Sequence, residues 1–360
     1  MTVLTAPANT LALTSGRLPK WAPWALLGGS FLVSFVIFGV ASIGADLADF
    51  NIAGAVIVGI LLYMVLITVL SAIAESRRKA VDRLMTALVA TAFLIALLPL
   101  ISLLWTVVAN GIARFDLEFF SFSMRNVVGE GGGAVHAIWG TVLITLMATV
   151  IAVPIGLMTS IYLVEYGRGR IAKGITFFVD VMTGIPSIVA GLFIYAVFAL
   201  LIGPGVSMGF MGALSLAVLM IPVVVRGSEE LLRIVPNELR EASYALGVPK
   251  WLTILKIVLP TSIAGITTSV MLAISRVIGE TAPLLLTAGF TLSLNTNLFS
   301  GQMMTLPVFV YNQYMNQGTN PEAALDRAWA GALTLIVIVM VLNLLARLIA
   351  KLFAPKTSGR

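Results

Sequence analysis

Glu241-Ala242-Ser243-Tyr244-Ala245-Leu246-Gly247 is a polar stretch that lies between two long apolar runs and continues to Ile257-Val258-Leu259-Pro260. Asn237 suits the N-cap of a helix, and Gly247 suits the left-handed position that ends one. Pro249 then opens a second short helix, which we expect Pro260 to end. The pattern predicts a helix–glycine–helix unit over residues 236–260, here called the elbow.

The first helix of the elbow has one apolar face. Leu239, Ala242, Ala245 and Leu246 fall on that face at helical spacing. A membrane protein that keeps such a unit in water, between spans, commonly uses it to contact a soluble partner. The alternative interpretation is a short amphipathic helix that lies at the membrane surface without a partner.

The composition is that of a membrane protein. Hydrophobic residues make up 59% of the 360 residues, the mean hydropathy is +1.04, and charged residues account for only 11%. These values predict an all-α polytopic membrane protein, because soluble chains carry far more charge. The positions of the charges then matter more than the net charge of +6, and we expect no nucleic-acid partner.

Several chemistries are excluded by the residues present. The chain has no cysteine, and His136 is its one histidine, so neither a disulfide framework nor a histidine metal cluster is expected. It has no Gly-x-x-x-x-Gly-Lys-Ser/Thr loop, so we expect any ATP to be bound by another subunit. No catalytic constellation can be built around His136. We therefore expect a transport subunit without an enzyme activity, cofactor or metal of its own.

Eight apolar runs are near the length needed to cross roughly 30 Å of hydrocarbon. They lie at residues 24–45, 52–74, 87–109, 138–164, 175–202, 209–225, 263–289 and 329–353. The sixth run is short for a separate crossing. The first run is long and has no small-x-small cleavage site, so we expect a span there, with a signal peptide as the alternative.

Basic residues predict the orientation. Of the 22 lysines and arginines, only Arg114, Arg125 and Arg327 lie in the alternate loops, and Arg276 lies inside a span. All the others lie near the chain ends or in the loops that share a side with them, the elbow included. The positive-inside rule therefore places both termini and the elbow in the cytoplasm.

Arg276 and Glu280 are charged residues inside the seventh span. At a spacing of four they are expected to share a helix face. A charge at mid-membrane costs at least ~2.5–3.5 kcal/mol, so it normally faces a pathway or a partner. A guanidinium matches phosphate-like oxyanions, and Glu280 could orient it. The alternative is a structural ion pair that fixes helix packing.

Other polar positions carry two interpretations each. Arg226, at the inner end of the sixth span, is either a positive-inside anchor or a second oxyanion contact. Pro186 kinks the fifth span, so the hydroxyls of Thr183 and Ser187 either line a passage or flank a simple packing kink. Asp180, in the same span, is expected to pair with a basic residue.

The loops at residues 110–137 and 290–328 are expected outside, opposite the elbow. The first contains Gly131-Gly132-Gly133, which prevents regular structure and lets the backbone approach a partner closely. It is either a flexible connector or part of the face that receives a substrate-binding protein. The second carries several asparagines and glutamines and could serve the same face.

Three segments together resemble one family. The elbow, with Glu241-Ala242, Gly247 and the ending at Pro260, looks like the EAA loop of binding-protein-dependent ABC importer permeases. Gly184-Ile185-Pro186-Ser187-Ile188-Val189-Ala190-Gly191-Leu192-Phe193 and Arg276-Val277-Ile278-Gly279-Glu280-Thr281-Ala282-Pro283-Leu284-Leu285 are similar to segments of phosphate ABC importer permeases. The Gly-Glu-Thr-Ala-Pro-Leu-Leu ending resembles the A-type (PstA) subunits. Ser243 departs from the third position of the Glu-Ala-Ala signature, but serine is small enough to keep a tight helix contact.

The resemblance covers about residues 84–353 and implies a division of the chain. That range would be the permease domain of six spans, with a core at 138–353 and a cytoplasmic coupling loop at 226–262. Residues 24–83 would be an additional two-helix segment. Short tails would lie at residues 1–23 and 354–360.

The same resemblance implies partners and roles. The chain would import inorganic phosphate across the bacterial cytoplasmic (inner) membrane beside a sister PstC-type permease. Two PstB-type ATPase subunits would use ATP and Mg²⁺, and an external PstS-type protein would deliver phosphate. The path residues would be Arg276, Glu280 and Arg226, with Thr183 and Ser187 as further candidates. The elbow would contact the ATPase through Leu239, Glu241, Ala242, Ser243, Leu246, Gly247 and Pro260.

Two alternatives to phosphate import follow from the residues. The same architecture could carry sulfate, molybdate or a phosphonate; protonated phosphate, unlike sulfate, can donate a hydrogen bond to Glu280, which favours phosphate. A secondary transporter or channel is the other alternative. Such proteins usually show paired repeats or broken helices in both halves, and neither feature is expected from this sequence.

Overall fold

The computed structural model describes residues 18–41 and 50–353, and these residues form helices and connecting loops without a strand. Seven of the described helices are long and apolar enough to cross a membrane, or eight spans if one bent helix pair counts as a single crossing. The prediction of an all-α polytopic membrane protein is confirmed. Residues 1–17 and 354–360, which include most of the two predicted tails, lie outside the described residues.

Two compact units make up the chain, one up to Leu104 and one from Trp105 onward. The first contains α1 (Ala22–Ala41), α2 (Ile52–Ala74) and most of α3 (Arg77–Gly111). Small residues let α1 and α2 pack closely, since a Cβ on Gly59 would meet the Phe31 ring at 2.9 Å. Ser34 on α1 also donates a hydrogen bond to the carbonyl of Ala55 on α2 at 2.6 Å.

Glu75 organises the turn between α2 and α3. Its carboxylate accepts hydrogen bonds from the Leu18 backbone N–H at 2.9 Å, the Ser71 hydroxyl at 2.9 Å and the Arg83 guanidinium at 3.0 Å. Burial raises the pKa of this carboxyl, but these hydrogen bonds and the basic neighbours outweigh burial, so the pKa lies below its usual 4.5. The charged carboxylate therefore ties the segment before α1 to the α2–α3 turn.

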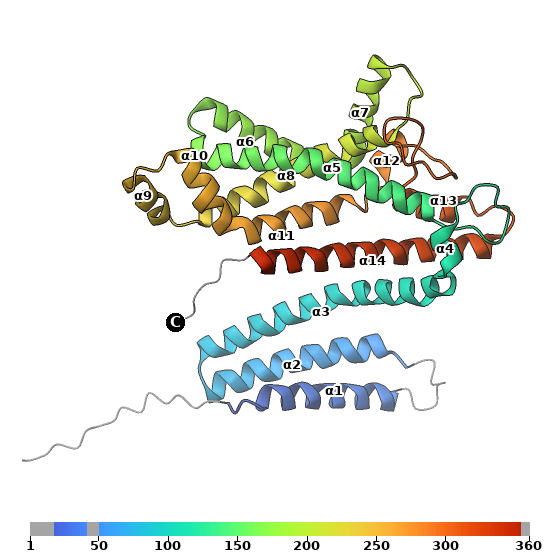
Figure 1. The fold of residues 1–360 in the computed structure, drawn as a ribbon. Helices are drawn as coiled ribbons and strands as arrows, with labels where there is room; N and C mark the ends of the chain where they lie inside the picture. Colours follow the sequence, from blue (N-terminus) through green and yellow to red (C-terminus); the bar gives the residue numbers. More distant parts are fainter. Residues whose placement is uncertain (1–17, 42–49, 354–360) are drawn as a thin grey trace, which may run out of the picture. The chain divides into compact units, whose positions relative to one another are not determined.

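The second unit holds the remaining helices (Figure 1). They are η2 (Ile112–Arg114), α4 (Leu117–Ser121), α5 (Val135–Ile161), the π-helical η3 (Tyr162–Tyr166), α6 (Arg170–Thr183), α7 (Ser187–Leu201), α8 (Gly209–Ile234), α9 (Asn237–Ala245), α10 (Lys250–Thr253), the π-helical η4 (Ile254–Val258), α11 (Leu259–Val277), α12 (Ala282–Thr287), α13 (Leu306–Met315) and α14 (Pro321–Phe353). The elbow, α9 and α10, lies at one end of this unit, and α4 and α13 lie at the other (Figure 1).

The core of this unit forms where α5 packs along α8 (Figure 1). Residues on α5 repeat every four positions toward the contact and are nearly all small: Gly140, Ile144, Ala148, Ala152 and Gly156. The helices come so close that a Cβ on Gly156 would meet Val224 of α8 at 2.7 Å. Small residues are favoured at such contacts in membranes, where close van der Waals packing drives helix association.

The fifth predicted span, 175–202, is not one straight helix. α6 and α7 meet at a 109° bend after Thr183, where Gly184-Ile185-Pro186 interrupts the helix. Pro186 has no N–H to donate and its ring excludes the residue before it from helical geometry, which explains why the break falls there. The prediction of a kink at Pro186 is confirmed, and the bend is large enough to divide the predicted span into two helices.

The seventh predicted span, 263–289, is also interrupted. α11 ends at Val277, and α12 begins at Ala282 after a short turn. Pro283 lies in the first turn of α12, where its missing N–H costs nothing. α12 packs on α7 so closely that a Cβ on Gly191 would meet the Cα of Pro283 at 2.7 Å. The prediction of one continuous helix from 263 to 289 was therefore wrong.

Other boundaries differ from the predictions in informative ways. Pro260 does not end a helix, because η4 widens the turn before it and α10, η4 and α11 run on as one span from Lys250 to Val277. Asn237 is the first residue of α9, with Pro236 before it, and does not cap the helix through its side chain. The predicted outer loop at 290–328 contains α13, whose residues Leu306, Val308 and Phe309 are buried in the core.

The backbone contact at Gly140 offers a test of the core. A Cβ there would lie 1.9 Å from the carbonyl oxygen of Met304, so Gly140→Ala must push two backbone segments apart. We expect the free energy of unfolding to fall by about 1–3 kcal/mol, as for overpacked cores. The measurement is thermal unfolding of the purified protein in detergent, followed by tryptophan fluorescence.

Gly174→Ala is the matched control. Gly174 lies within α6 with nothing within 4 Å of a Cβ, so alanine should leave stability unchanged or raise it by up to ~1 kcal/mol. Equal unfolding temperatures for the two variants would contradict the close contact at Gly140.

Candidate functional site

The elbow is held by a glycine-based helix end. Gly247 has a φ of +76°, and its N–H donates to the carbonyl of Tyr244 at 2.9 Å, while the Val248 N–H donates to the carbonyl of Ser243 at 3.2 Å. These two bonds are the usual end of a helix whose next residue is left-handed. The predicted role of Gly247 as the residue that ends the first elbow helix is confirmed.

One side of α9 is turned away from the rest of the chain. Leu246 is 83% exposed and Leu239 41% exposed, and Glu241, Ala242 and Gly247 are exposed as well. The buried member of the predicted coupling set is Ser243, whose hydroxyl forms a 2.8 Å hydrogen bond with the hydroxyl of Thr253 on α10. Ser243 therefore fixes the angle of the elbow, and the exposed leucines form an unfilled apolar surface on it.

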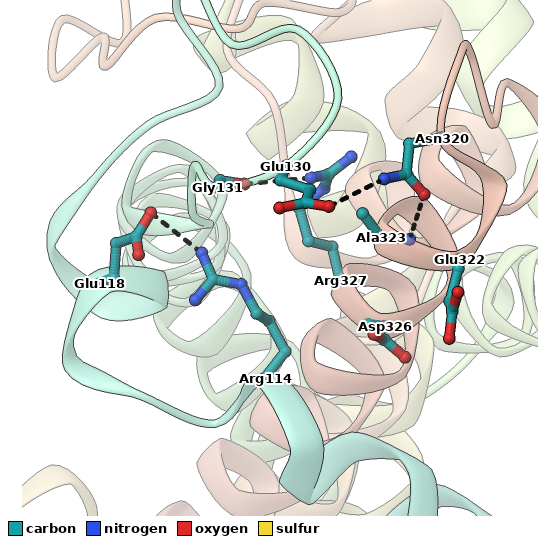
Figure 2. Close-up of a pocket in the computed structure, with 9 residues that line it drawn as sticks. All are labelled: Arg114, Glu118, Glu130, Gly131, Asn320, Glu322, Ala323, Asp326 and Arg327. Atoms are coloured by element: carbon teal, nitrogen blue, oxygen red, sulfur yellow. Dashed lines mark hydrogen bonds and ion pairs between the residues drawn. The ribbon is translucent and has the colours of Figure 1, made fainter.

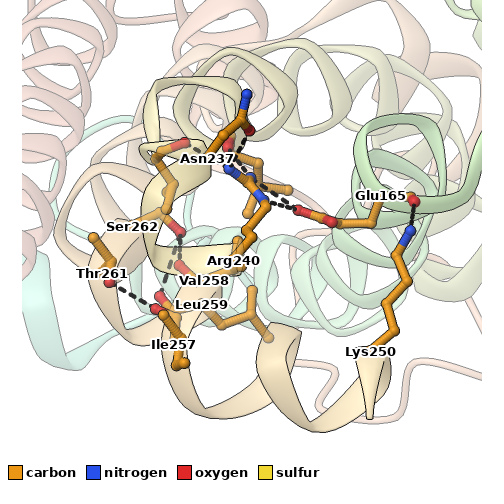
Figure 3. Close-up of polar contacts among 11 residues, drawn as sticks. Glu165, Asn237, Arg240, Lys250, Ile257, Val258, Leu259, Thr261 and Ser262 are labelled. Carbon is orange, nitrogen blue, oxygen red and sulfur yellow. Dashed lines mark hydrogen bonds and ion pairs between the residues drawn. The ribbon is translucent and has the colours of Figure 1, made fainter. Parts of the chain in front are cut away.

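A buried ion pair fixes the elbow to the end of α5 (Figure 3). The Arg240 guanidinium contacts the Glu165 carboxylate at 2.9 Å, and it donates to the carbonyls of Leu232 at 2.9 Å and Val235 at 2.6 Å. Lys250 donates from Nζ to the backbone carbonyl of Glu165. We call Glu165, Arg240 and Lys250 the elbow clamp. It joins η3, the last turn of α8 and both elbow helices.

Sequence reasoning missed the roles of Glu165 and Arg240 in this clamp. Arg240 directly precedes the signature residue Glu241, and Glu165 is an isolated acid at the end of a long apolar run. An unpaired acid near the end of a span was the available signal, because such a group needs a basic partner. The partner is 75 residues away in sequence, so spacing could not identify it.

Arg226 is bound by two carboxylates. Its guanidinium contacts Asp180 on α6 and Glu229 at 2.9 Å on its own helix, and Glu229 in turn contacts Arg233 at 2.7 Å. The basic partner expected for Asp180 is thus Arg226. The chain of four charges ties α6 to α8, and it leaves Arg226 charge-compensated, with its side chain one-third exposed.

Arg276 and Glu280 do not share a helix face as expected. Arg276 lies exposed in the last turn of α11, whereas Glu280 lies beyond the end of that helix, just before α12. The ion pairs among the described residues do not include either of them. The alternative of a structural ion pair is therefore not realised in this conformation.

Thr183 and Ser187 flank the break between α6 and α7. The Thr183 hydroxyl donates to the carbonyl of Val179 at 2.9 Å, and Thr183 is exposed. Ser187 is half-buried at the first position of α7. Both residues thus lie at an interruption of a span, which is where polar groups can line a passage through a membrane protein.

The end opposite the elbow is built around two arginines (Figure 2). Arg327 on α14, only 5% exposed, donates to the carbonyls of Gly129 at 2.8 Å and Gly131 at 3.0 Å. Arg114 donates to the carbonyl of Gly132 at 2.9 Å. Gly129, Gly131 and Gly132 all have positive φ, a conformation that glycine adopts without strain. The glycine loop is therefore anchored at three carbonyls and is more than a flexible connector.

Acidic side chains surround these arginines and line a pocket of about 510 Å³ (Figure 2). They are Glu118, Glu130, Glu322 and Asp326. Beside the pocket, burial raises the pKa of Asp116, but hydrogen bonds from the Phe119 N–H and from Arg114 outweigh burial and hold the pKa below its usual 3.8. The described residues contain no group of three or more His, Asp or Glu side chains arranged to hold a metal ion.

Comparison with known proteins agrees with this architecture. Residues 152–359 match the model of the family described as binding-protein-dependent transport system inner membrane component. A phosphate transport system permease protein PstA 1 of Mycobacterium tuberculosis is 48% identical over 277 residues, which cover 76% of this chain and 90% of that protein. PstA proteins of Mycobacterium leprae, 46% identical over 79% of this chain and 93% of theirs, and of Yersinia pestis, 39% identical over 78% and 95%, are also similar.

Solved structures share the fold at low sequence identity. An inward-facing MetNI methionine ABC transporter matches with a TM-score of 0.51 at 19% identity, over 61% of this chain and 96% of that one. A bacterial alginate ABC transporter matches with a TM-score of 0.53 at 14% identity, over 75% of this chain and 96% of that one. The chain therefore belongs to the binding-protein-dependent transport system inner membrane component family of multi-pass membrane permeases, and it is similar to the PstA permeases.

Proposed function

We propose that this chain is the transmembrane permease subunit of an ATP-driven importer of inorganic phosphate. The observation that carries the proposal is the identity of up to 48%, over about three quarters of the chain, with permeases named for phosphate transport. An exposed apolar elbow at one end and an anchored polar surface at the other also suit a subunit with different partners on the two sides of a membrane.

The elbow is the contact with the ATPase. Leu239 and Leu246 provide apolar area that nothing in the described chain covers, as expected of a surface that fits into a groove on another protein. Glu241, Ala242, Gly247 and Pro260 are exposed as well, while the buried Ser243 joins α9 to α10 through Thr253. Two PstB-type ATPase subunits would bind here and at a sister PstC-type permease. They would supply the ATP and Mg²⁺ chemistry that this chain lacks.

The positive-inside rule orients the molecule. The elbow end is rich in lysine and arginine, so we place it and both termini in the cytoplasm. The anchored glycine loop then faces outward, where a PstS-type phosphate-binding protein would dock. Its preformed backbone and the acidic rim around Arg114 and Arg327 suit a receiving surface better than a mobile linker does.

The phosphate path uses the arginines within the spans. Arg276 has no carboxylate partner in the described residues and is exposed, so its guanidinium is available to an oxyanion, with Glu280 nearby in sequence to accept a phosphate proton. Arg226 must exchange at least one of its contacts, with Asp180 or Glu229, to bind phosphate. Thr183 and Ser187 contribute hydroxyls at the helix break. Sulfate, molybdate or a phosphonate would use the same guanidinium chemistry and are the alternative cargoes.

The elbow clamp transmits motion. Arg240 donates to Glu165 and to two α8 carbonyls at once, so movement of α9 must pull on η3 and on the end of α8. A buried charge pair of this kind adds little net stability but is costly to break, which makes it a stiff link. ATPase closure would act on the spans through this link.

Arg276→Gln tests the path. We expect phosphate uptake into vesicles that contain all the partner subunits to fall by about tenfold or more, because one charge-assisted hydrogen bond is lost. Assembly and ATP hydrolysis should persist. Arg347→Gln, a change of the same type at the exposed end of α14, is the control and should transport normally. Unchanged uptake would remove Arg276 from the path, and wild-type uptake of sulfate but not phosphate would favour the alternative cargo.

Leu246→Asp tests the elbow surface. The leucine is 83% exposed in the described chain, so the change should leave folding intact while weakening ATPase binding by ~2 kcal/mol or more, as at an interface hot spot. Co-purification of the ATPase subunit is the measurement. Leu117→Asp, at an 85% exposed leucine on α4 at the opposite end, should retain the ATPase. Equal recovery with both variants would argue against docking through α9.

Arg240→Gln tests the clamp. It leaves the buried Glu165 carboxylate without its partner, which typically costs about 3–5 kcal/mol, so we expect a lower unfolding temperature and less phosphate transported per ATP hydrolysed. Lys256→Gln, an exposed change in the same elbow, should alter neither quantity.

A double variant separates the buried charge from the rest of the contact. Glu165→Gln/Arg240→Gln removes both charges, and it should be more stable than Arg240→Gln alone. A double variant that is no more stable than the single variant would show that the ion pair is not what holds the elbow.

A further inference from the structure

A second pocket, of about 460 Å³, lies beside the elbow clamp. It is bounded on one side by η3 and Arg168, on the other by the two elbow helices, and also by Arg233 of α8. Its charged lining consists of Arg168, Arg233, Arg240, Lys250 and Glu165. We call it the elbow pocket. The pocket thus holds four cations and one carboxylate, and Figure 3 shows the clamp contacts that form part of its wall.

The one carboxylate in the lining, that of Glu165, is already paired with an arginine of the chain. Glu165 is paired with Arg240, whose guanidinium also donates to the carbonyls of Leu232 and Val235, so this pair is neutral and saturated. Lys250 donates to the Glu165 backbone carbonyl and lies 4.8 Å from the centre of the Tyr166 ring, and neither contact cancels its charge.

Two further cations also face the pocket with donors to spare. Arg168 is exposed and belongs to none of the ion pairs among the described residues. Arg233 contacts Glu229 with one nitrogen, and its side chain is 65% exposed. Arg168, Lys250 and, in part, Arg233 therefore create an uncompensated positive potential within one concave site.

We propose that the elbow pocket binds a phosphate-type oxyanion, supplied either as inorganic phosphate or as the headgroup of an anionic phospholipid. Two guanidinium groups and an ammonium group are the donors that such oxygens prefer. Asn237, the first residue of the nine-residue α9, also lines the pocket, so the positive end of that helix faces the same site. The volume leaves room for a group larger than free phosphate.

The position of the pocket gives its occupant a defined effect. Arg168 follows the last turn of the α5 span, and Lys250 begins the second elbow helix. An anion held between them would add a second bridge next to the clamp, and it would stabilise the elbow relative to the spans. The site rests on this geometry and does not require phosphate to be the transported ion.

The free-anion arm of the test uses the full chain in nanodiscs of neutral phosphatidylcholine. Inorganic phosphate is titrated against chloride at constant ionic strength while thermal unfolding is followed. All variants carry Arg276→Gln, which weakens phosphate binding in the proposed transport path and is the same in every comparison. We expect a saturable rise in the unfolding temperature, and Arg168→Gln should raise the half-saturating concentration by about tenfold through loss of one charge-assisted hydrogen bond.

Arg170→Gln is the matched control, an exposed arginine two residues away that does not line the pocket. It should leave the titration unchanged. An equal effect of the Arg168 and Arg170 changes would overturn the proposal, because it would show a diffuse surface potential in place of a site.

The lipid arm replaces part of the neutral lipid by phosphatidylglycerol and counts retained lipids by native mass spectrometry. If inorganic phosphate has no effect but phosphatidylglycerol is retained in an Arg168-dependent way, the occupant is a headgroup. If neither anion responds to Arg168→Gln, the proposal is wrong, and the pocket is left as a surface for an acidic partner protein. Phosphate uptake by the Arg168→Gln complex, measured in parallel with intact Arg276, reports separately on the transport function.

Discussion

The close contact between α5 and α8 is the constraint on which the second unit depends. In a membrane there is little hydrophobic gain from joining two apolar helices, so they associate only where their surfaces fit closely. The row from Gly140 to Gly156 provides that fit, with the Met304 backbone seated against Gly140 and Val224 against Gly156. Once α5 and α8 are paired, the short helices α12 and α13 are packed against them, and the elbow extends from the end of α8.

The two ends of the second unit differ in which charged side chains are paired within the chain. At the glycine-loop end, Arg327 is buried and its donors are used by carbonyls and by Gln313, and Arg114 is matched by Asp116 and Glu118. The arginines at that end are therefore bonded within the chain, and Glu130, Glu322 and Asp326 at the pocket belong to none of the ion pairs among the described residues. At the elbow end Glu165, Asp180 and Glu229 are paired within the chain, whereas Arg168 and Lys250 belong to none of the ion pairs among the described residues. Such a difference suits an unlike partner on each side of the membrane.

Much of the architecture can be predicted from the lengths of the apolar runs and the positions of the prolines. The elbow in particular could be predicted from its sequence. Gly247 follows a short amphipathic segment, and a left-handed glycine there ends the helix as expected. The sequence predicts a kink at Pro186, because proline removes a backbone hydrogen bond and clashes with the preceding turn whatever the rest of the fold is. Its 109° angle depends on α7 packing against α12, a contact between residues about ninety positions apart, which a local rule cannot supply.

The polar network was the least predictable part. Arg276 and Glu280 have helical spacing, yet the helix ends between them, because α12 turns away to pack on α7 and α8. Charge alone predicted that Asp180 needs a basic partner, but several were available, and only the fold selects Arg226. Glu165 and Arg240 could not be paired from sequence for the same reason.

The two π-helical turns have a consequence for register. One added residue in an ordinary α-helix rotates everything beyond it by about 100°, and a π turn absorbs that residue within a single wide turn. η3 ends the α5 helix and η4 precedes α11, so each separates a membrane-facing stretch from the elbow. The buried faces of α5 and α11 can therefore stay aligned with α8 while Glu165 and Lys250 are set at the angle that the elbow requires. Each π-helical turn thus adjusts the rotation of the residues on its elbow side relative to the packed span, so that both the helix packing and the docking surface keep their required orientations.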